Sequence, residues 1–186
     1  MTTHLSSRFL PTRRWALLAS ALALAVGTAA HAHGPTRQKV EDATTIQAPA
    51  AKVWALIKDV DALKTWYPNL ESASASDGAK KGSVRTLKLK GGGELVETIQ
   101  TADDEGMRLS LRAKDGGALP VSNYTSHLKV TADGDNQSKV EWRGAFYRGY
   151  PNNDPPPDQN DEAAIKAVSE LYKAGLANLK KQAEAK

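Results

Sequence analysis

The stretch that decides the fold is TIQAPAAKVWALIKDVDALKTWYP, residues 45–68. It continues an alternation of apolar and polar residues over 39–47, which is typical of a strand and ends before Pro49. Proline is favoured in the first turn of a helix, and the apolar residues that follow it recur at helical spacing. Residues 61–68 predict a second short helix that its final proline ends. The order is therefore one strand followed by two short helices.

Beyond this stretch the apolar period changes from helical to two, which is typical of strands. The segments between the predicted strands are short and rich in glycine, aspartate and asparagine, the residues that form turns. Strands joined so closely predict an antiparallel meander. The predicted strands span residues 83–90, 94–100, 107–114, 121–130 and 139–150.

The last part of the chain returns to a helical period after Pro157. Asn160 or Asp161 can cap this helix, and acidic residues occupy its first turn. Its apolar stripe is long, so it needs a sheet face to cover it. A strand, two short helices, a strand meander and a long final helix together predict an α+β fold. The stripe contains Ile165, Val168, Tyr172, Leu176 and Leu179.

Two strings are the most characteristic of the chain, APAAKVW at 48–54 and FYRGYPNNDPPP at 146–157. With the order of elements, they resemble the START/Bet v 1-like superfamily, also described as SRPBCC or polyketide cyclase/dehydrase-like proteins. The resemblance covers residues 33–186. It implies a helix-grip fold, in which a curved antiparallel sheet of about six to seven strands wraps around the long C-terminal helix. It also implies a cavity for a small apolar or amphipathic molecule.

A finer resemblance comes from HGPTRQKVE at 33–41, taken together with the string at 146–157. Both are similar to a periplasmic MxaD-like subgroup, which includes an accessory protein of bacterial methanol oxidation. This resemblance implies a periplasmic dehydrogenase or its cytochrome as a partner. Tyr67 departs from the Trp-His-Pro found in many relatives, so no role of that histidine is carried over to this chain.

Residues 1–32 are predicted to be an export signal peptide, and residues 33–186 the mature domain. Arginines precede an apolar run at 15–30 that is short for a membrane span, and small residues flank a cleavage position after Ala32. The string TRRWAL at 12–17 resembles a twin-arginine export motif. Ordinary secretion and an uncleaved N-terminal anchor are the alternatives. The signal predicts a periplasmic protein with no integral membrane span in its mature chain.

The charge of the mature chain argues against nucleic acid as a partner. Three arginines are the only charged residues in 1–32, so 22 of the 25 basic residues and all 21 acidic ones remain, a net charge of +1. No basic cluster is left to follow a phosphate backbone. The chain has no cysteine, which suits an oxidising compartment. His33 and His127 supply too few nitrogen ligands for a copper or zinc site, so we expect no metal and no cofactor.

The apolar parity of each strand predicts which side chains face the helix. Arg85 and Glu97 share the parity of the leucines and the isoleucine beside them, so both charges are predicted to point inward. If the glycines at 91–93 form the turn, the two side chains are diagonal neighbours and can form a buried ion pair. Pairing removes much of the cost of burying a charge, which favours a structural role.

The strand at 139–150 is interpreted as one wall of the cavity. Large rings with a polar tip can both line a cavity and orient a ligand. Gly144 lies among these rings and leaves room for a ligand or for close approach of the helix. The prolines at 151–157 stop strand pairing and are expected to form a stiff mouth or hinge. The candidate ligand-binding residues are Arg85, Glu97, Leu109, Tyr124, Trp142, Phe146, Arg148 and Tyr172.

Functions from different classes fit this pattern. The resemblance, and the outward parity of His127 in a chain without a nucleophile motif, predict a non-enzymatic binding or accessory protein. The alternative is a cyclase- or dehydratase-like enzyme, in which Glu97 is the general base and Arg85 or Tyr124 stabilises a developing enolate. That enzyme needs an unpaired Glu97, whereas Arg85 is its predicted neighbour. A third interpretation, a scaffold with a filled core, predicts that no ligand is retained.

Overall fold

The computed structural model describes residues 34–185. The predicted signal peptide at 1–32 and His33 lie outside the described residues. Over 34–185, none of the helices combines the length and the apolar character that a bilayer span requires.

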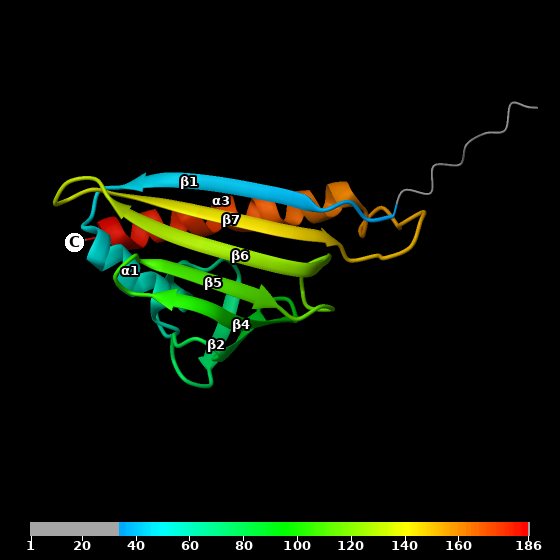
Figure 1. Ribbon diagram of the computed structural model, residues 1–186, viewed down its shortest axis with the longest axis horizontal. Helices are drawn as coiled ribbons and strands as arrows, with labels where there is room; N and C mark the ends of the chain where they lie inside the picture. The colour runs from blue at the N-terminus through cyan, green and yellow to red at the C-terminus, as the bar shows by residue number, and fades with distance from the viewer. Residues whose placement is uncertain (1–33, 186) are drawn as a thin grey trace, which may run out of the picture. The chain divides into compact units, whose positions relative to one another are not determined.

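The described chain consists of a seven-stranded antiparallel sheet and three helices, in the predicted α+β order. The elements are β1 (Gln38–Ile46), α1 (Ala50–Lys58), α2 (Leu63–Trp66), β2 (Leu70–Ala75), β3 (Val84–Leu89), β4 (Glu94–Asp103), β5 (Arg108–Ala113), β6 (Val121–Ala132), β7 (Ser138–Arg148) and α3 (Asp161–Glu184). Across the sheet the order is β1-β7-β6-β5-β4-β3-β2. Figure 1 shows α3 lying along one face of the sheet, behind β1 and β7. The predicted helix-grip arrangement is confirmed.

β2 is the strand that the apolar pattern does not predict. Its sequence LESASA contains Leu70 as its one large apolar residue, so it carries no alternating signal. Backbone pairing with β3 makes it a strand at the edge of the sheet. α2 is shorter than the helix predicted at 61–68. Tyr67 is already extended there, because the residue before a proline is driven out of the helical region.

α3 begins and packs largely as its sequence predicts. The Asn160 side chain caps the helix by accepting a hydrogen bond from the Ala163 N–H (2.7 Å). Of the predicted apolar stripe, Ile165 is only half-buried and the other four residues are buried. The helix approaches β7 so closely that a Cβ on Gly175 would lie 2.6 Å from the ring of Trp142. The stripe is therefore in direct contact with the sheet.

The β3–β4 hairpin differs from its predicted register. The connection spans residues 89–93 and not 91–93 alone, and the Leu89 N–H donates to the Gly93 carbonyl (3.1 Å). All three glycines at 91–93 have a positive φ, which larger residues adopt only with strain. Because the loop takes two more residues from β3, Arg85 lies directly opposite Glu97. The prediction of a diagonal pair was wrong by this shift.

Candidate functional site

The interior between the sheet and α3 contains all eight candidate residues, each with a relative exposure of no more than 5%. Their burial matches the parity predicted for β3 to β7. His127 lies on the opposite, solvent-facing side of the sheet, where its Nδ1 is hydrogen-bonded to Ser110 Oγ (2.8 Å). His127 therefore does not contribute to the interior. The candidate site consists of the buried side chains alone.

The rings of Trp142 and Tyr172 occupy the space beside β7. They stack with centroids 4.3 Å apart and an interplanar angle of 17°. A Cβ on Gly144 would collide with the Tyr172 hydroxyl, so the room that this glycine leaves is taken by the helix. The Tyr172 hydroxyl is hydrogen-bonded to the Tyr124 hydroxyl (2.8 Å), and Trp142 Nε1 donates to Ser126 Oγ (2.8 Å). At Trp142 the space predicted for a ligand is thus filled.

Further rings extend this cluster towards the short helices. The Trp66 ring meets Trp142 edge-on with centroids 5.9 Å apart, and Tyr67 lies 6.2 Å from Trp142. Tyr124 and Phe146 are also in edge contact, at 5.9 Å. Such pairs contribute about 0.5–1.5 kcal/mol each beyond the burial of their surface. The half of the interior next to β7 is therefore an aromatic core.

Tyr67 connects the aromatic core to the charged pair. Burial raises the pKa of its phenol far above the ordinary value. The negative charge of Glu97 raises this pKa further, and the Arg85 guanidinium opposes that effect, so Tyr67 lies within electrostatic reach of both. Within residues 34–185 its hydroxyl makes no hydrogen bond, although the residue is only 5% exposed. Tyr67 is a neutral donor inside the protein, and the sequence analysis did not select it.

The pair of Arg85 and Glu97 is the one place where β3 and β4 put charges into the interior. Arg85 Nε donates to Glu97 Oε2 at 2.6 Å, with side-chain exposures of 6% and 3%. A guanidinium has five N–H donors and a carboxylate two acceptor oxygens. Only this single bond joins either group to another side chain within residues 34–185. The pair therefore has unused donors and an unused acceptor.

α3 covers the strands beside the aromatic core and not the strands that carry the charged pair. α3 packs mainly on β1 and β7, while α2 contacts α3 and β2. The inward side chains of β3, β4 and β5 lie beyond the strands on which α3 rests. Apolar residues surround the pair on these strands, namely Leu87, Leu95, Ile99, Leu109 and Leu111, all buried. This half of the interior combines an apolar wall with a neutral ion pair.

Arg148 holds the loop that follows β7. Its guanidinium donates to the carbonyl oxygens of Tyr150 (3.0 Å) and Asn152 (2.8 Å) and to Asp161 Oδ2 (3.0 Å). These bonds tie the end of the strand and the proline loop to the first turn of α3. Arg148 is buried, and its contacts are to the protein itself. It acts as a latch on the predicted mouth.

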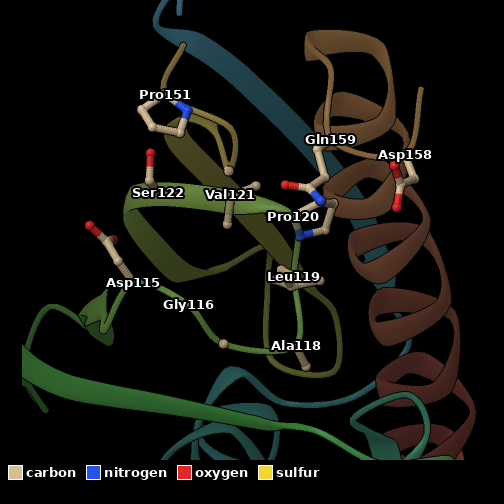
Figure 2. A pocket seen from close by; sticks show the side chains of 12 residues that line it. Asp115, Gly116, Ala118, Leu119, Pro120, Val121, Ser122, Pro151, Asp158 and Gln159 are labelled. Atoms are coloured by element: carbon tan, nitrogen blue, oxygen red, sulfur yellow. The ribbon is translucent and has the colours of Figure 1, made fainter. Parts of the chain in front are cut away.

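A hollow of about 700 Å³ lies beside this latch (Figure 2). Figure 2 shows Pro151 and Ser122 on one side of it and Asp158 and Gln159 on the other. Val121 lines the hollow and is paired with Arg148 across β6 and β7, so the hollow adjoins the latched end of the interior. Apart from Pro151 in the predicted mouth, these residues have no common sequence pattern, because two loops far apart in the chain bring them together. The hollow is lined by residues 115–122 with Gly149, Pro151, Asp158 and Gln159.

Residues 37–184 match the family described as polyketide cyclase / dehydrase and lipid transport. The chain belongs to this family. The match spans the sheet and all three helices described above. Membership accounts for the arrangement of a helix gripped by a sheet, a ligand-binding and cyclase-like fold. No curated protein matches the chain.

Solved structures of other proteins share the fold of this family member. An uncharacterised protein from Bacillus thuringiensis is 27% identical with a TM-score of 0.65, over 78% of this chain and 98% of that one. The protein XoxI from Bacillus cereus is 26% identical with a TM-score of 0.65, over 78% and 94% of the two chains. The ZhuI aromatase/cyclase from Streptomyces sp. R1128 has a TM-score of 0.69 at 18% identity, over 80% and 94%. The last of these supports the fold alone.

Proposed function

We propose that this family member is a non-enzymatic binding protein that holds a small apolar or amphipathic molecule beside the Arg85–Glu97 pair. The carrying observation is a buried ion pair with unused hydrogen-bonding groups inside an apolar interior. Among the described residues, Asp161 Oδ1 is the one side-chain atom that is fully buried without a partner, so the unpaired groups of Arg85 and Glu97 still reach accessible space. A bound molecule can occupy that space and pair with them. The family's description includes lipid transport, which fits a ligand of this kind.

The proposed position of the ligand follows from what is already filled. Trp142 and Tyr172 are in van der Waals contact and leave no room between them. Tyr67 lies within electrostatic reach of the charged pair, and Leu87, Leu95 and Ile99 flank the pair on β3 and β4. Leu109 is opposite Ala102 and lies further along the sheet. A ligand beside the pair would bury its apolar part against the leucines of β3 to β5 and direct its polar group to the pair. The hollow next to Arg148 would be its way in.

Native mass spectrometry of protein purified from the periplasm tests this proposal. We expect a fraction of the protein to carry a small molecule that is released on denaturation. Leu87→Trp, at the inward residue next to Arg85 on β3, would fill the proposed space and lower this fraction. His127→Ala on the outer face is the matched control and would leave it unchanged. If the unmodified protein and the control both fold and neither carries a small molecule, the result would favour a scaffold with a filled core.

A cyclase- or dehydratase-like enzyme is the second candidate, and the unused Oε1 of Glu97 is the observation that favours it. In such an enzyme Oε1 would take the proton, while Arg85 and Tyr124 would stabilise an enolate. A binding protein is preferred over an enzyme because Glu97 Oε2 is already paired with Arg85 Nε at 2.6 Å. Glu97→Gln separates the two: turnover would vanish in an enzyme, whereas a binding protein would change only its affinity or stability.

For localisation and partner we propose export to the periplasm and action beside a methanol-type dehydrogenase or its cytochrome. The supports are the signal-like residues 1–32 and the resemblance of the strings at 33–41 and 146–157 to the MxaD-like subgroup. N-terminal sequencing of the exported protein should begin at His33. Adding the purified protein to a periplasmic dehydrogenase and its cytochrome should change their electron-transfer rate, and an unchanged rate would contradict the accessory role.

A further inference from the structure

We propose that the interior site selects ligands whose polar group is uncharged, and that the Arg85–Glu97 pair imposes this selection. The inference rests on the proposed binding function and names the class of ligand: amphiphiles with a hydroxyl or carbonyl group. Carboxylates and ammonium compounds of the same length bind more weakly.

The pair presents no net charge to the interior. Arg85 and Glu97 lie directly opposite each other on adjacent strands, with their charged groups 2.6 Å apart. The other buried charged side chain is Arg148, which is engaged with Asp161 at the latch. Within residues 34–185, no third buried charge stands beside the pair. A charge brought in by a ligand would therefore find no counter-ion left over.

An uncompensated charge is costly in such surroundings. Moving a charged group from water to an apolar interior costs several kcal/mol unless a partner neutralises it. The charged group of a ligand would also compete for Arg85 or Glu97, which already neutralise each other. About 1.4 kcal/mol corresponds to a factor of ten in affinity. Even if the protein offsets part of the cost of burying the ligand's charge, a large difference in affinity between charged and neutral ligands remains. A carboxylate or an ammonium group should therefore bind at least about tenfold more weakly than a neutral group.

A neutral polar group, by contrast, finds partners at the pair. The terminal nitrogens of Arg85 and the Tyr67 hydroxyl are donors without a partner among the described residues. Glu97 Oε1 is an acceptor that also has no partner among the described residues. A ligand hydroxyl can accept a hydrogen bond from Arg85 or Tyr67 and donate one to Glu97 Oε1. A ligand carbonyl can accept a hydrogen bond from Arg85 or Tyr67. The site thus satisfies one alcohol or ketone without changing its charge.

Octanol, octanoate and octylammonium test the selection, because they share an alkyl chain and differ in the charge of the head group. Binding to the mature protein at neutral pH is measured by calorimetry and by the fluorescence of the buried tryptophans. We expect octanol to bind at least about tenfold more tightly than either ion. Octanoate binding as tightly as octanol would overturn the inference and leave the proposed binding function standing. If none of the three binds, the proposed function fails as well.

Charge variants test whether the pair is the cause. Glu97→Gln leaves Arg85 unneutralised, so octanoate should overtake octanol. The double variant R85Q/E97Q restores neutrality with similar side-chain size, and the preference for octanol should return. An unchanged order of the three probes in E97Q would overturn the role of the pair. If E97Q does not fold, the double variant decides: it must keep the preference of the unmodified protein, and a preference for octanoate would contradict the inference.

Discussion

Trp142 and Tyr172 each stack over a glycine of the opposite element. The two rings lie 4.3 Å apart, with Tyr172 of α3 above Gly144 of β7 and Trp142 of β7 above Gly175 of α3. Side chains at either glycine would push the helix away from the sheet. This reciprocal contact sets the distance between the two layers.

Gly144→Ala should destabilise the protein by about 1–3 kcal/mol, the usual cost of overpacking a core. The new Cβ would collide with the Tyr172 hydroxyl and lie 3.0 Å from the ring of Tyr124. Urea unfolding followed by tryptophan fluorescence measures the change. Tyr172→Phe removes the colliding oxygen, so the double variant should recover part of the loss. Gly34→Ala, with nothing within 4 Å of its new Cβ, is the control. A fully stable G144A would show that α3 is free to move.

Arg85→Met should destabilise the protein by about 3–5 kcal/mol, because it leaves Glu97 buried without its partner. Glu97→Met should have a similar effect for the same reason. The double variant places two apolar side chains in an apolar wall, and its stability should return close to that of the unmodified protein. Equilibrium unfolding of the unmodified protein, the two single variants and the double variant gives the interaction free energy between Arg85 and Glu97. Additive losses would indicate that each charge has another partner in the interior.

The sequence predicts the inward parity because one face of the sheet is buried and side chains alternate along each strand. This places Arg85, Glu97 and Trp142 in the interior without coordinates. It does not predict β2, whose serines and alanines have no alternating signal, and it misplaces Arg85 by two residues in the pairing with β4. The length of a glycine-rich loop is fixed by backbone geometry, which three adjacent glycines leave open.

The occupancy of the interior could not be predicted from parity. Gly144 is compatible both with a ligand and with close approach of α3, and only the position of Tyr172 decides between them. Tyr67 was predicted to lie in the second short helix, and its position within electrostatic reach of the charged pair depends on the chain leaving that helix before Pro68. Such contacts join segments that are far apart in the sequence. Local patterns carry no information about them.

Stability should fall as the pH rises above about 10, the ordinary pKa of tyrosine. Burial raises the pKa of Tyr67, Tyr124 and Tyr172, so these phenols keep their protons in the folded protein while the unfolded chain loses them. The stabilisation is fully present below the unfolded pKa and is lost as the pH rises towards the folded values. Each buried tyrosine contributes a slope of about 1.4 kcal/mol per pH unit.

Urea unfolding between neutral and strongly alkaline pH measures this slope, and phenolate absorbance shows when the tyrosines ionise. Tyr67→Phe should reduce the slope by about one tyrosine's share. Tyr147→Phe is the control, since that side chain is only half-buried. Phenolate formation by all five tyrosines near the ordinary pKa, without unfolding, would contradict the burial of the three rings.

Arg148→Gln should release the loop at residues 149–160 while leaving the sheet intact. The variant loses the bonds to two carbonyl oxygens and to Asp161 Oδ2, and Asp161 Oδ1 is already buried without a partner among the described residues. Hydrogen exchange and limited proteolysis should therefore speed up in the loop and in the first turn of α3, by about tenfold for each 1.4 kcal/mol of local stability lost.

Arg143→Gln is the matched control for the latch, because that arginine is on the same strand with its side chain 58% exposed and should leave the loop unchanged. Entry of octanol should also become faster in R148Q with little change in affinity, since the latch adjoins the hollow at Val121 and lies away from the charged pair. Equal entry rates in R148Q and R143Q would mean that the ligand does not pass this end of the sheet. In that case the proposed route through the hollow would be wrong, whereas the binding site at Arg85 and Glu97 would be unaffected.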